Sequence, residues 1–276
     1  MQIAILNGQI GEYDKLDRAW LNFGTFFGDG VYEVIRSYNG KLFAVDEHLE
    51  RLKGSMEKIG IDGVDISAIK EDILKGFGDS NIANAKIYVQ ITRGCGERSH
   101  GLPDEIQPDC LITITELPDF SEQKKDGVKA ITYPDIRWKR CDIKSLNLLA
   151  NVMATREAEK QGCKEAVFVE ENGLITECAS AAFFAIIDGK IYTAPLSANI
   201  LPSITRKYIL KACGNVGIEV VEEQISKEQA YQASELFIGV STRDIAGIIE
   251  LDGNIISDGK CGPITKKLNN HFKTYV

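Results

Sequence analysis

The chain has 276 residues, of which 44% are hydrophobic and 26% charged, so it can bury a sizeable core and is neither disordered nor fibrous. Its 40 acidic side chains outnumber the 32 basic ones, and a formal charge of -8 argues against a nucleic-acid-binding protein. No apolar run approaches the about 18 residues of a membrane span, and the chain starts without a basic, cleavable leader. We therefore expect a cytoplasmic globular protein with no membrane partner.

Tight-turn residues divide the sequence into strand-like runs. Four Asn-Gly or Asp-Gly pairs accept the positive φ angles of two-residue turns and predict antiparallel hairpins. Apolar and polar residues alternate over 85–92, which predicts a strand, whereas helical spacing predicts helices near 46–59 and 66–77. The four turn pairs are Asn39-Gly40, Asn172-Gly173, Asp188-Gly189 and Asp252-Gly253.

The polar stretch 118–127 is the clearest candidate for a linker. We place an N-terminal α+β domain at residues 1–119, the linker at 120–127 and a C-terminal domain at 128–276. Beyond the linker, clusters of strands alternate with helices and are joined partly by hairpins, which favours an α+β fold over a doubly wound parallel sheet. The elements expected there are strands near 128–133, 165–170, 181–187, 190–193, 235–240 and 246–251, and helices from Ser145, near 203–213 and near 263–274.

Several common functional motifs are absent from the sequence. There is no GxxxxGK[ST] loop and no three-glycine dinucleotide loop, which disfavours nucleotide hydrolysis and dinucleotide redox chemistry. The histidines at 48, 100 and 271 form no i,i+4 pair, and the seven cysteines have no CxxC spacing. We therefore expect no metal site.

The segment 135–149, DIRWKRCDIKSLNLL, contains the main catalytic candidate. Lys144 precedes Ser145, which we expect to cap a helix. A lysine at the positive end of a helix dipole, near other cations and partly desolvated, would have a lowered pKa and act as a nucleophilic amine. A solvated lysine in a basic run would show the same pattern. The apolar face expected for this helix consists of Leu146, Leu149, Val152 and Met153.

Eight motifs in order connect the sequence with a known family. They are FGDGVYEVIRSYNG (27–40), EHLERL (47–52), IYVQITRG (87–94), RSHGLP (98–103), DIRWKRCDIKSLNLL (135–149), ITE (175–177), ITR (204–206) and DGKCGPITKKL (258–268). With these motifs the chain resembles the class IV pyridoxal-phosphate-dependent aminotransferases, and most closely the bacterial D-amino acid transaminases. The resemblance implies a two-domain α+β fold that holds pyridoxal 5'-phosphate in the cleft between the domains.

The resemblance also implies roles around the cofactor ring. Lys144 matches the lysine that forms the internal aldimine and later moves the Cα proton. This chemistry needs an amine that is nucleophilic at neutral pH and becomes a local base. Glu177 matches the carboxylate that pairs with the pyridine nitrogen, keeping it protonated so that the ring accepts electrons.

The family's phosphate-binding residues have matches in three segments. Arg51 matches the phosphate arginine, and Ile204 and Thr205 lie at an expected helix start, where free N–H groups favour an anion. Ser241 and Thr242 match a second pair of hydroxyl and backbone donors. Without the resemblance, Arg51 would be read as a solvated helix residue and the last two as strand-end caps.

Arg98 and His100 distinguish subgroups of the family. Arg-x-His, together with a tyrosine matched by Tyr32, is the pattern with which D-amino acid transaminases hold the substrate α-carboxylate. An arginine fork suits a carboxylate because it donates two parallel charged hydrogen bonds. In the family this loop enters the neighbouring subunit's active site, which implies a homodimer. As a solvated loop, the pair would have no such role.

The predicted reaction is ping-pong transfer of an amino group from a D-amino acid such as D-alanine to a 2-oxo acid such as 2-oxoglutarate. The alternatives are a branched-chain L-amino acid transaminase, an aminodeoxychorismate lyase and a non-catalytic pyridoxal-phosphate-binding protein. Asn22-Phe23-Gly24 replaces the usual Asp-Arg-Gly, and four further positions depart from the D-amino acid transaminase pattern. They are Ala179, Ala182, Val240 and Arg243. We expect a cation at 243 either to favour dicarboxylate substrates or to face solvent.

Overall fold

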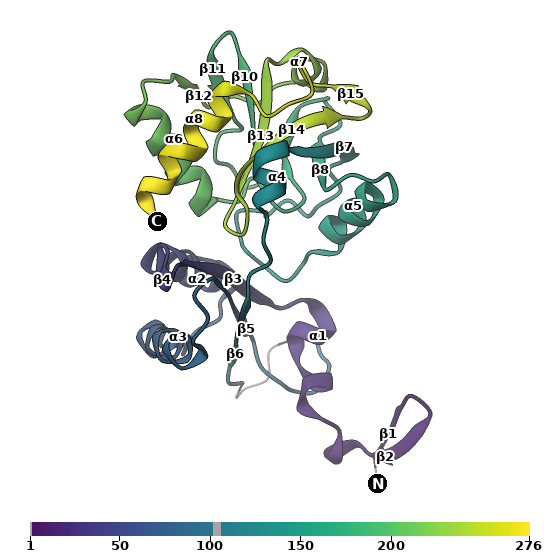
Figure 1. Ribbon diagram of the computed structural model, residues 1–276. Coiled ribbons are helices and arrows are strands. Elements are labelled where there is room, and N and C mark those ends of the chain that lie inside the picture. Colours follow the sequence, from purple (N-terminus) through teal and green to yellow (C-terminus); the bar gives the residue numbers. More distant parts are fainter. Residues whose placement is uncertain (1, 102–105) are drawn as a thin grey trace.

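Two main sheets and a small N-terminal hairpin make up the computed structural model, which describes residues 2–101 and 106–276 (Figure 1). Leu102 and Pro103 of the RSHGLP motif lie outside these residues. The first half of the chain contains β1 (Ile3–Leu6), β2 (Gln9–Glu12), two 3-10 turns (Tyr13–Lys15 and Arg18–Leu21), α1 (Phe23–Phe27), β3 (Gly30–Tyr38), β4 (Lys41–Leu42), α2 (Val45–Ile59), α3 (Ile66–Ser80), β5 (Ala85–Thr92), β6 (Asp109–Glu116) and α4 (Ser121–Asp126).

The first main sheet has four antiparallel strands in the order β4-β3-β5-β6. Gly30–Arg36 of β3 pairs with Lys86–Thr92 of β5, and alternate side chains such as Ile35 and Ile87 are fully buried. Leu52 of α2 belongs to the same core, which α2 and α3 cover on one side. Because side chains alternate along a strand, this packing leaves the other face of β3 free to line a site.

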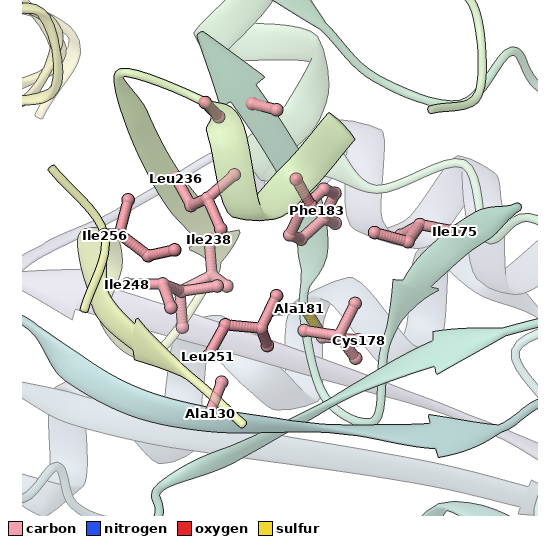
Figure 2. Close-up of a cluster of buried hydrophobic side chains, with 14 of the residues drawn as sticks. Ala130, Ile175, Cys178, Ala181, Phe183, Leu236, Ile238, Ile248, Leu251 and Ile256 are labelled. Atoms are coloured by element: carbon pink, nitrogen blue, oxygen red, sulfur yellow. The ribbon is translucent and has the colours of Figure 1, made fainter. Parts of the chain in front are cut away.

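The second half of the chain forms the larger sheet. Its elements are β7 (Val128–Pro134), α5 (Leu149–Lys160), β8 (Glu165–Val169), β9 (Ile175–Cys178), β10 (Ala182–Ile187), β11 (Lys190–Tyr192), α6 (Ile204–Asn215), β12 (Val220–Val221), α7 (Lys227–Gln232), β13 (Glu235–Val240), β14 (Asp244–Leu251), β15 (Asn254–Ile255), α8 (Pro263–Phe272) and a 3-10 turn (Lys273–Tyr275). Figure 2 shows part of its core, where Phe183, Leu236 and Ile248 are buried together.

This sheet has nine strands in the order β12-β11-β10-β13-β14-β7-β8-β9, with β15 alongside β14. Of its pairings between described strands, β11–β12, β14–β7 and β7–β8 are parallel and the others are antiparallel. Helices α6 and α8 pack on each other and on β13. This mixture of hairpins and helices confirms the predicted α+β fold.

Three of the four predicted turn pairs close tight hairpins. In β3–β4, β10–β11 and β14–β15, both turn residues have positive φ, as at Asn39 (48°) and Gly40 (83°). Such angles match the right-handed twist of the flanking strands. Between β8 and β9 only Gly173 (82°) is left-handed, so that turn is of another type.

The prediction of a helix starting at Ser145 is wrong. Helix α5 begins at Leu149, four residues later, with no side-chain cap. Ser145 instead forms a β-bridge with Val31 of β3, so the segment is extended where we expected a helix dipole. The apolar face expected for this helix is also wrong: Leu149, Val152 and Met153 are exposed (71%, 38% and 44%), and small alanines form the buried side.

The segment 120–127 contains helix α4, which packs on β14 (Figure 1). Lys124 of this helix pairs with the buried Asp244 at the start of β14, at 3.1 Å. A boundary there, between domains at 1–119 and 128–276, stays a prediction. Within residues 2–101 and 106–276, no helix combines the length and the apolar character needed to cross a bilayer.

Candidate active site

Lys144 lies on the extended segment that pairs with β3. Tyr32 donates its backbone N–H to the carbonyl of Lys144 at 2.9 Å, and Leu146 donates its own to Gly30 at 3.0 Å. The Nζ atom of Lys144 lies 4.2 Å from the centroid of the Tyr32 ring. Strand β3 therefore holds an amine and an aromatic ring at one place.

A cavity of about 110 Å³, open to solvent, surrounds this amine. Residues of both main sheets line it, so groups distant in the sequence meet there. Five of the residues predicted for the site lie on its wall. They are Tyr32, Arg51, Lys144, Glu177 and Ser241.

Glu177, the third residue of β9, contributes a buried carboxylate to the cavity wall and is 6% exposed. Its Oε1 atom pairs with the guanidinium of Arg137 and accepts the backbone N–H of Leu201 at 3.3 Å. Burial raises the pKa of Glu177, while the positive charge of Arg137 opposes the rise. The wall therefore carries a desolvated acid held beside one cation.

Arg51 of α2 is held by a buried carboxylate behind it. Its Nε and Nη2 atoms donate to the two oxygens of Glu33 at 2.7 and 2.8 Å, and Nη1 donates to the carbonyl of Pro202 at 2.9 Å. Nδ1 of His48 lies 2.7 Å from Glu33, and since an ionised carboxylate only accepts, His48 is the donor. Burial lowers the pKa of His48, which agrees with a neutral ring.

The contacts of Arg51 leave donors free for an anion. No described residue accepts a bond from the remaining N–H groups on Nη1 and Nη2, and Arg51 lines the cavity. At the start of α6, Ser203 caps the amide of Arg206, while no described residue accepts from the amides of Ile204 or Thr205. Free donors at a helix start and an arginine fork are what a phosphate group needs.

The other residues predicted to hold phosphate lie around this cavity. Thr242 lines an adjoining cavity that also reaches Lys144 and Arg51, and Ile204 lines one on a further side of Arg51. Thr205 is buried beside Ile204 in the first turn of α6. The structure thus gathers these residues near Arg51, whereas their contact with phosphate remains a prediction.

The charge pair behind Arg51 makes stability depend on pH. Burial pushes the pKa of Glu33 up, but the charge of Arg51 and the hydrogen bonds from Arg51 and His48 outweigh it and leave a pKa of about 2. The stabilisation is present above the ordinary value of 4.5 and is lost as pH falls towards about 2. We expect Glu33→Gln to lower the free energy of unfolding at pH 7, and this deficit to shrink by about 1.4 kcal/mol per pH unit below 4.5.

Urea unfolding at several pH values measures this deficit, and a constant deficit would contradict the assignment. The same variant should weaken cofactor binding by about 10-fold, as loss of a group that orients a ligand from behind usually does. Glu235→Gln is the matched control, because Glu235 is another buried glutamate, one that accepts the amides of Ile264 and Thr265 away from the cavity. It should reduce stability and leave cofactor affinity unchanged.

Arg98 and His100 do not line the Lys144 cavity of their own chain. The Cζ atom of Arg98 is 5.1 Å from the ring centroid of Phe27, and the rings of His100 and Phe27 are 5.4 Å apart. His100 lines a separate cavity, which shares Trp138 and Asn147 with the first one. Within one chain, then, the predicted carboxylate-binding pair stands apart from the amine.

The expectation that Arg243 faces solvent is wrong. Its Nη2 donates to Glu165 at 3.0 Å and to Ser180 at 2.9 Å, and its side chain is 11% exposed. Ser180 in turn donates to Glu165 at 2.6 Å. Glu165 pairs with this cation and the side chain is largely buried, so Arg243 does not face solvent, whereas its effect on substrate range stays a prediction.

Sequence reasoning missed the charged groups behind the cavity wall. Arg137 and Asp135 form a pair behind Glu177, and Glu33 and His48 hold Arg51. The i,i+2 spacing of Asp135 and Arg137 indicates a local pair, but nothing in the sequence places that pair beside residue 177. Glu33 could have been noted as a charge between Val31 and Ile35 on the inward face of a predicted strand.

Comparisons with known proteins identify the family of the chain. Residues 30–251 match the model of the class IV amino-transferase family, to which the chain therefore belongs. It is 38% identical to the D-alanine aminotransferase of Staphylococcus epidermidis (100% of this chain, 98% of the relative) and 37% identical to that of Bacillus licheniformis (99% and 96%). A branched-chain amino acid aminotransferase from Escherichia coli superposes with a TM-score of 0.87 at 26% identity, over 97% of this chain and 92% of that one.

The predicted family, fold and pyridoxal-phosphate-dependent aminotransferase activity are thereby confirmed. The residues of the cavity fit this cofactor. Lys144 offers an amine, Glu177 an open carboxylate oxygen for a ring cation, and Arg51 free donors for a phosphate. The two charges of the cofactor thus have partners of opposite sign in one cavity.

Proposed function

We propose that the chain is a D-amino acid transaminase that moves an amino group from a donor such as D-alanine to a 2-oxo acid such as 2-oxoglutarate by a ping-pong mechanism. The observation that carries this proposal is the cavity joining Lys144 to Glu177 and Arg51. The choice of D-amino acids is supported by the relatives named D-alanine aminotransferase, which match the whole chain. The sequence motif Arg98-x-His100 supports the same choice.

Bound pyridoxal phosphate supplies an aldehyde that takes up the amino group and a ring that withdraws electrons from Cα. Lys144 would hold the cofactor, and its freed amine would act as the base that moves the proton of the substrate Cα. Glu177 holds the pyridine nitrogen through its open oxygen. Arg51, the first turn of α6 and the Ser241–Thr242 turn hold the phosphate.

We further propose that Arg98 and His100 hold the substrate carboxylate in the neighbouring subunit's site, together with Tyr32 of that site, so that the active form is a homodimer. The support is their placement against Phe27, apart from Lys144 of the same chain. No described residue pairs with the Arg98 guanidinium, so its fork of donors stays available for a carboxylate. A second copy of the chain provides that site.

The test of the proposed function is a donor panel with both enantiomers of alanine and of leucine, and 2-oxoglutarate as acceptor. We expect turnover with D-alanine and little with either L-amino acid. Turnover with L-leucine and none with D-alanine would instead identify a branched-chain L-amino acid transaminase. Release of 4-aminobenzoate from aminodeoxychorismate would identify the lyase, and bound cofactor without any half-reaction would indicate a non-catalytic binding protein.

A further inference from the structure

Arg137 makes more contacts than any role so far requires. Its Nε and Nη2 atoms donate to the two oxygens of Asp135 at 2.9 and 2.7 Å, and Nη2 also donates to Thr176 and to the carbonyl of Asn199, both at 3.2 Å. Its Cζ lies 4.6 Å from the centroid of the Phe168 ring. The side chain is 5% exposed, so this guanidinium is fixed on several sides before it meets Glu177.

The contacts of Glu177 with Arg137 and Leu201 use only one carboxylate oxygen. Both partners bond to Oε1, and no described residue donates to Oε2. Among described residues the buried side-chain polar atoms without a partner are Nε of Arg36 and Nε of Arg206, so Oε2 of Glu177 keeps an accessible surface. Since Glu177 lines the Lys144 cavity, that surface faces the cavity. The two contacts that hold Oε1 thus direct Oε2 at a ligand in the cavity.

The charges of this cluster leave room for one more cation. Asp135 and Glu177 are acids, with side chains 8% exposed, and Arg137 is the cation that contacts both. When both acids are ionised the cluster carries one net negative charge, which a protonated pyridine nitrogen at Oε2 would balance. Without the guanidinium, two desolvated acids would stand close together, and one of them would take up a proton.

We propose that Arg137, fixed by Asp135, is a positioning residue that keeps Glu177 ionised and directs its Oε2 atom at the pyridine nitrogen, and so keeps that nitrogen protonated. Arg137 acts on the nitrogen only through Glu177. Burial alone raises the pKa of Glu177, and the charge of Arg137 works against this rise. A neutral Glu177 could share its own proton with the nitrogen without leaving a full positive charge on the ring, and the ring would then withdraw electrons less strongly.

The proposal is tested first on the nitrogen itself, using holoenzyme reconstituted with pyridoxal phosphate that carries ¹⁵N in the ring. The ¹⁵N chemical shift reports whether the nitrogen is protonated. We expect a protonated nitrogen in the wild type and in Arg137→Lys, which keeps the charge, and an unprotonated one in Arg137→Leu. The same protonated shift in Arg137→Leu as in the wild type would overturn the proposal.

Kinetics give a second readout, which rests on the proposed function. In Arg137→Leu we expect kcat for the D-alanine half-reaction to fall by about 10- to 100-fold, as for other groups that orient a ligand from behind, with KM little changed. A wild type that is inactive on D-alanine would refute the proposed function, whereas the ¹⁵N measurement would still test Arg137. An active wild type with unchanged kcat in Arg137→Leu would refute the role of Arg137 and leave the proposed function standing.

Two further variants separate positioning from folding. Arg137→Leu leaves Asp135 buried without its partner, so Asp135→Asn/Arg137→Leu removes both charges and should recover stability but neither kcat nor the protonated shift. Full recovery of kcat and of the protonated shift would overturn the proposal, because it would show that Arg137 only neutralises the buried charge of Asp135. Arg93→Leu is the matched control, since Arg93 is a buried arginine paired with Asp29 outside the Lys144 cavity. It should reduce stability without changing the ¹⁵N shift or the cofactor affinity.

Discussion

Lys144→Ala is expected to abolish transamination and to remove the visible absorbance of the bound cofactor. The Nζ atom of Lys144 lies over the Tyr32 ring, and Lys144 lines the cavity in which we propose that the cofactor binds. Proton transfer by a positioned amine alone contributes about 10²- to 10⁴-fold, and loss of the covalent attachment adds to this. Stopped-flow measurement of the D-alanine half-reaction and an absorbance spectrum test both effects.

Lys139→Ala is the control for this prediction. Lys139 belongs to the same basic stretch but is exposed and is not on the wall of the Lys144 cavity, so its loss should leave turnover unchanged. Borohydride reduction of the wild-type holoenzyme, followed by peptide mapping, should attach the cofactor to Lys144 and not to Lys139. An active and normally coloured Lys144→Ala variant, or a label on another lysine, would refute the assignment.

The residues that meet at the cavity could be predicted from the sequence because each stands in its own motif. Tyr32, Arg51, Lys144, Glu177 and Ser241 come from separate segments, and the family resemblance was needed to state that the segments converge. Residue chemistry alone would have left Arg51 as a surface helix residue. The hairpins could be predicted for a different reason. Asn-Gly and Asp-Gly turns are determined locally by the φ angles that these residues tolerate.

The backbone conformation around Lys144 could not be predicted from the sequence, because pairing with a distant strand determines it. Ser145 is a good helix cap by local preference, but in the fold its segment pairs with β3, more than a hundred residues earlier, and α5 starts at Leu149. Tertiary pairing therefore overrides the local preference here. As a result, no helix dipole acts on Lys144.

Charges that support the site from behind escape sequence analysis for a related reason. Arg137 sits in a basic run and looks like a solvated residue, whereas Glu33 stands on the inward face of a strand without an evident partner. The fold buries them against Glu177 and Arg51. A buried charge needs a buried partner, but the sequence does not tell which one. The structure supplies these pairs, and with them a reason why the two predicted cofactor contacts are preorganised.

Arg98→Leu is expected to lower kcat/KM for D-alanine by about 10- to 1000-fold, the loss of a charged bidentate contact worth about 1.5–4 kcal/mol. The substitution should weaken binding of the substrate α-carboxylate and leave cofactor binding intact, so the absorbance spectrum of the bound cofactor should stay normal. Steady-state kinetics with D-alanine and an absorbance spectrum separate the two effects. Unchanged kcat/KM would place the carboxylate site elsewhere.

Mixing the impaired Arg98→Leu variant with the inactive Lys144→Ala variant tests whether Arg98 acts in the neighbouring subunit. A mixed dimer of Arg98→Leu with Lys144→Ala holds one site that combines an intact Lys144 from the first chain with an intact Arg98 from the second. If the subunits exchange at random, about a quarter of the wild-type sites are restored in an equal mixture of a two-fold dimer. Activity that rises on mixing supports action across the interface. If the subunits are shown to exchange and no activity returns, Arg98 acts in the site of its own subunit. In that arrangement each site of a mixed dimer lacks either Arg98 or Lys144.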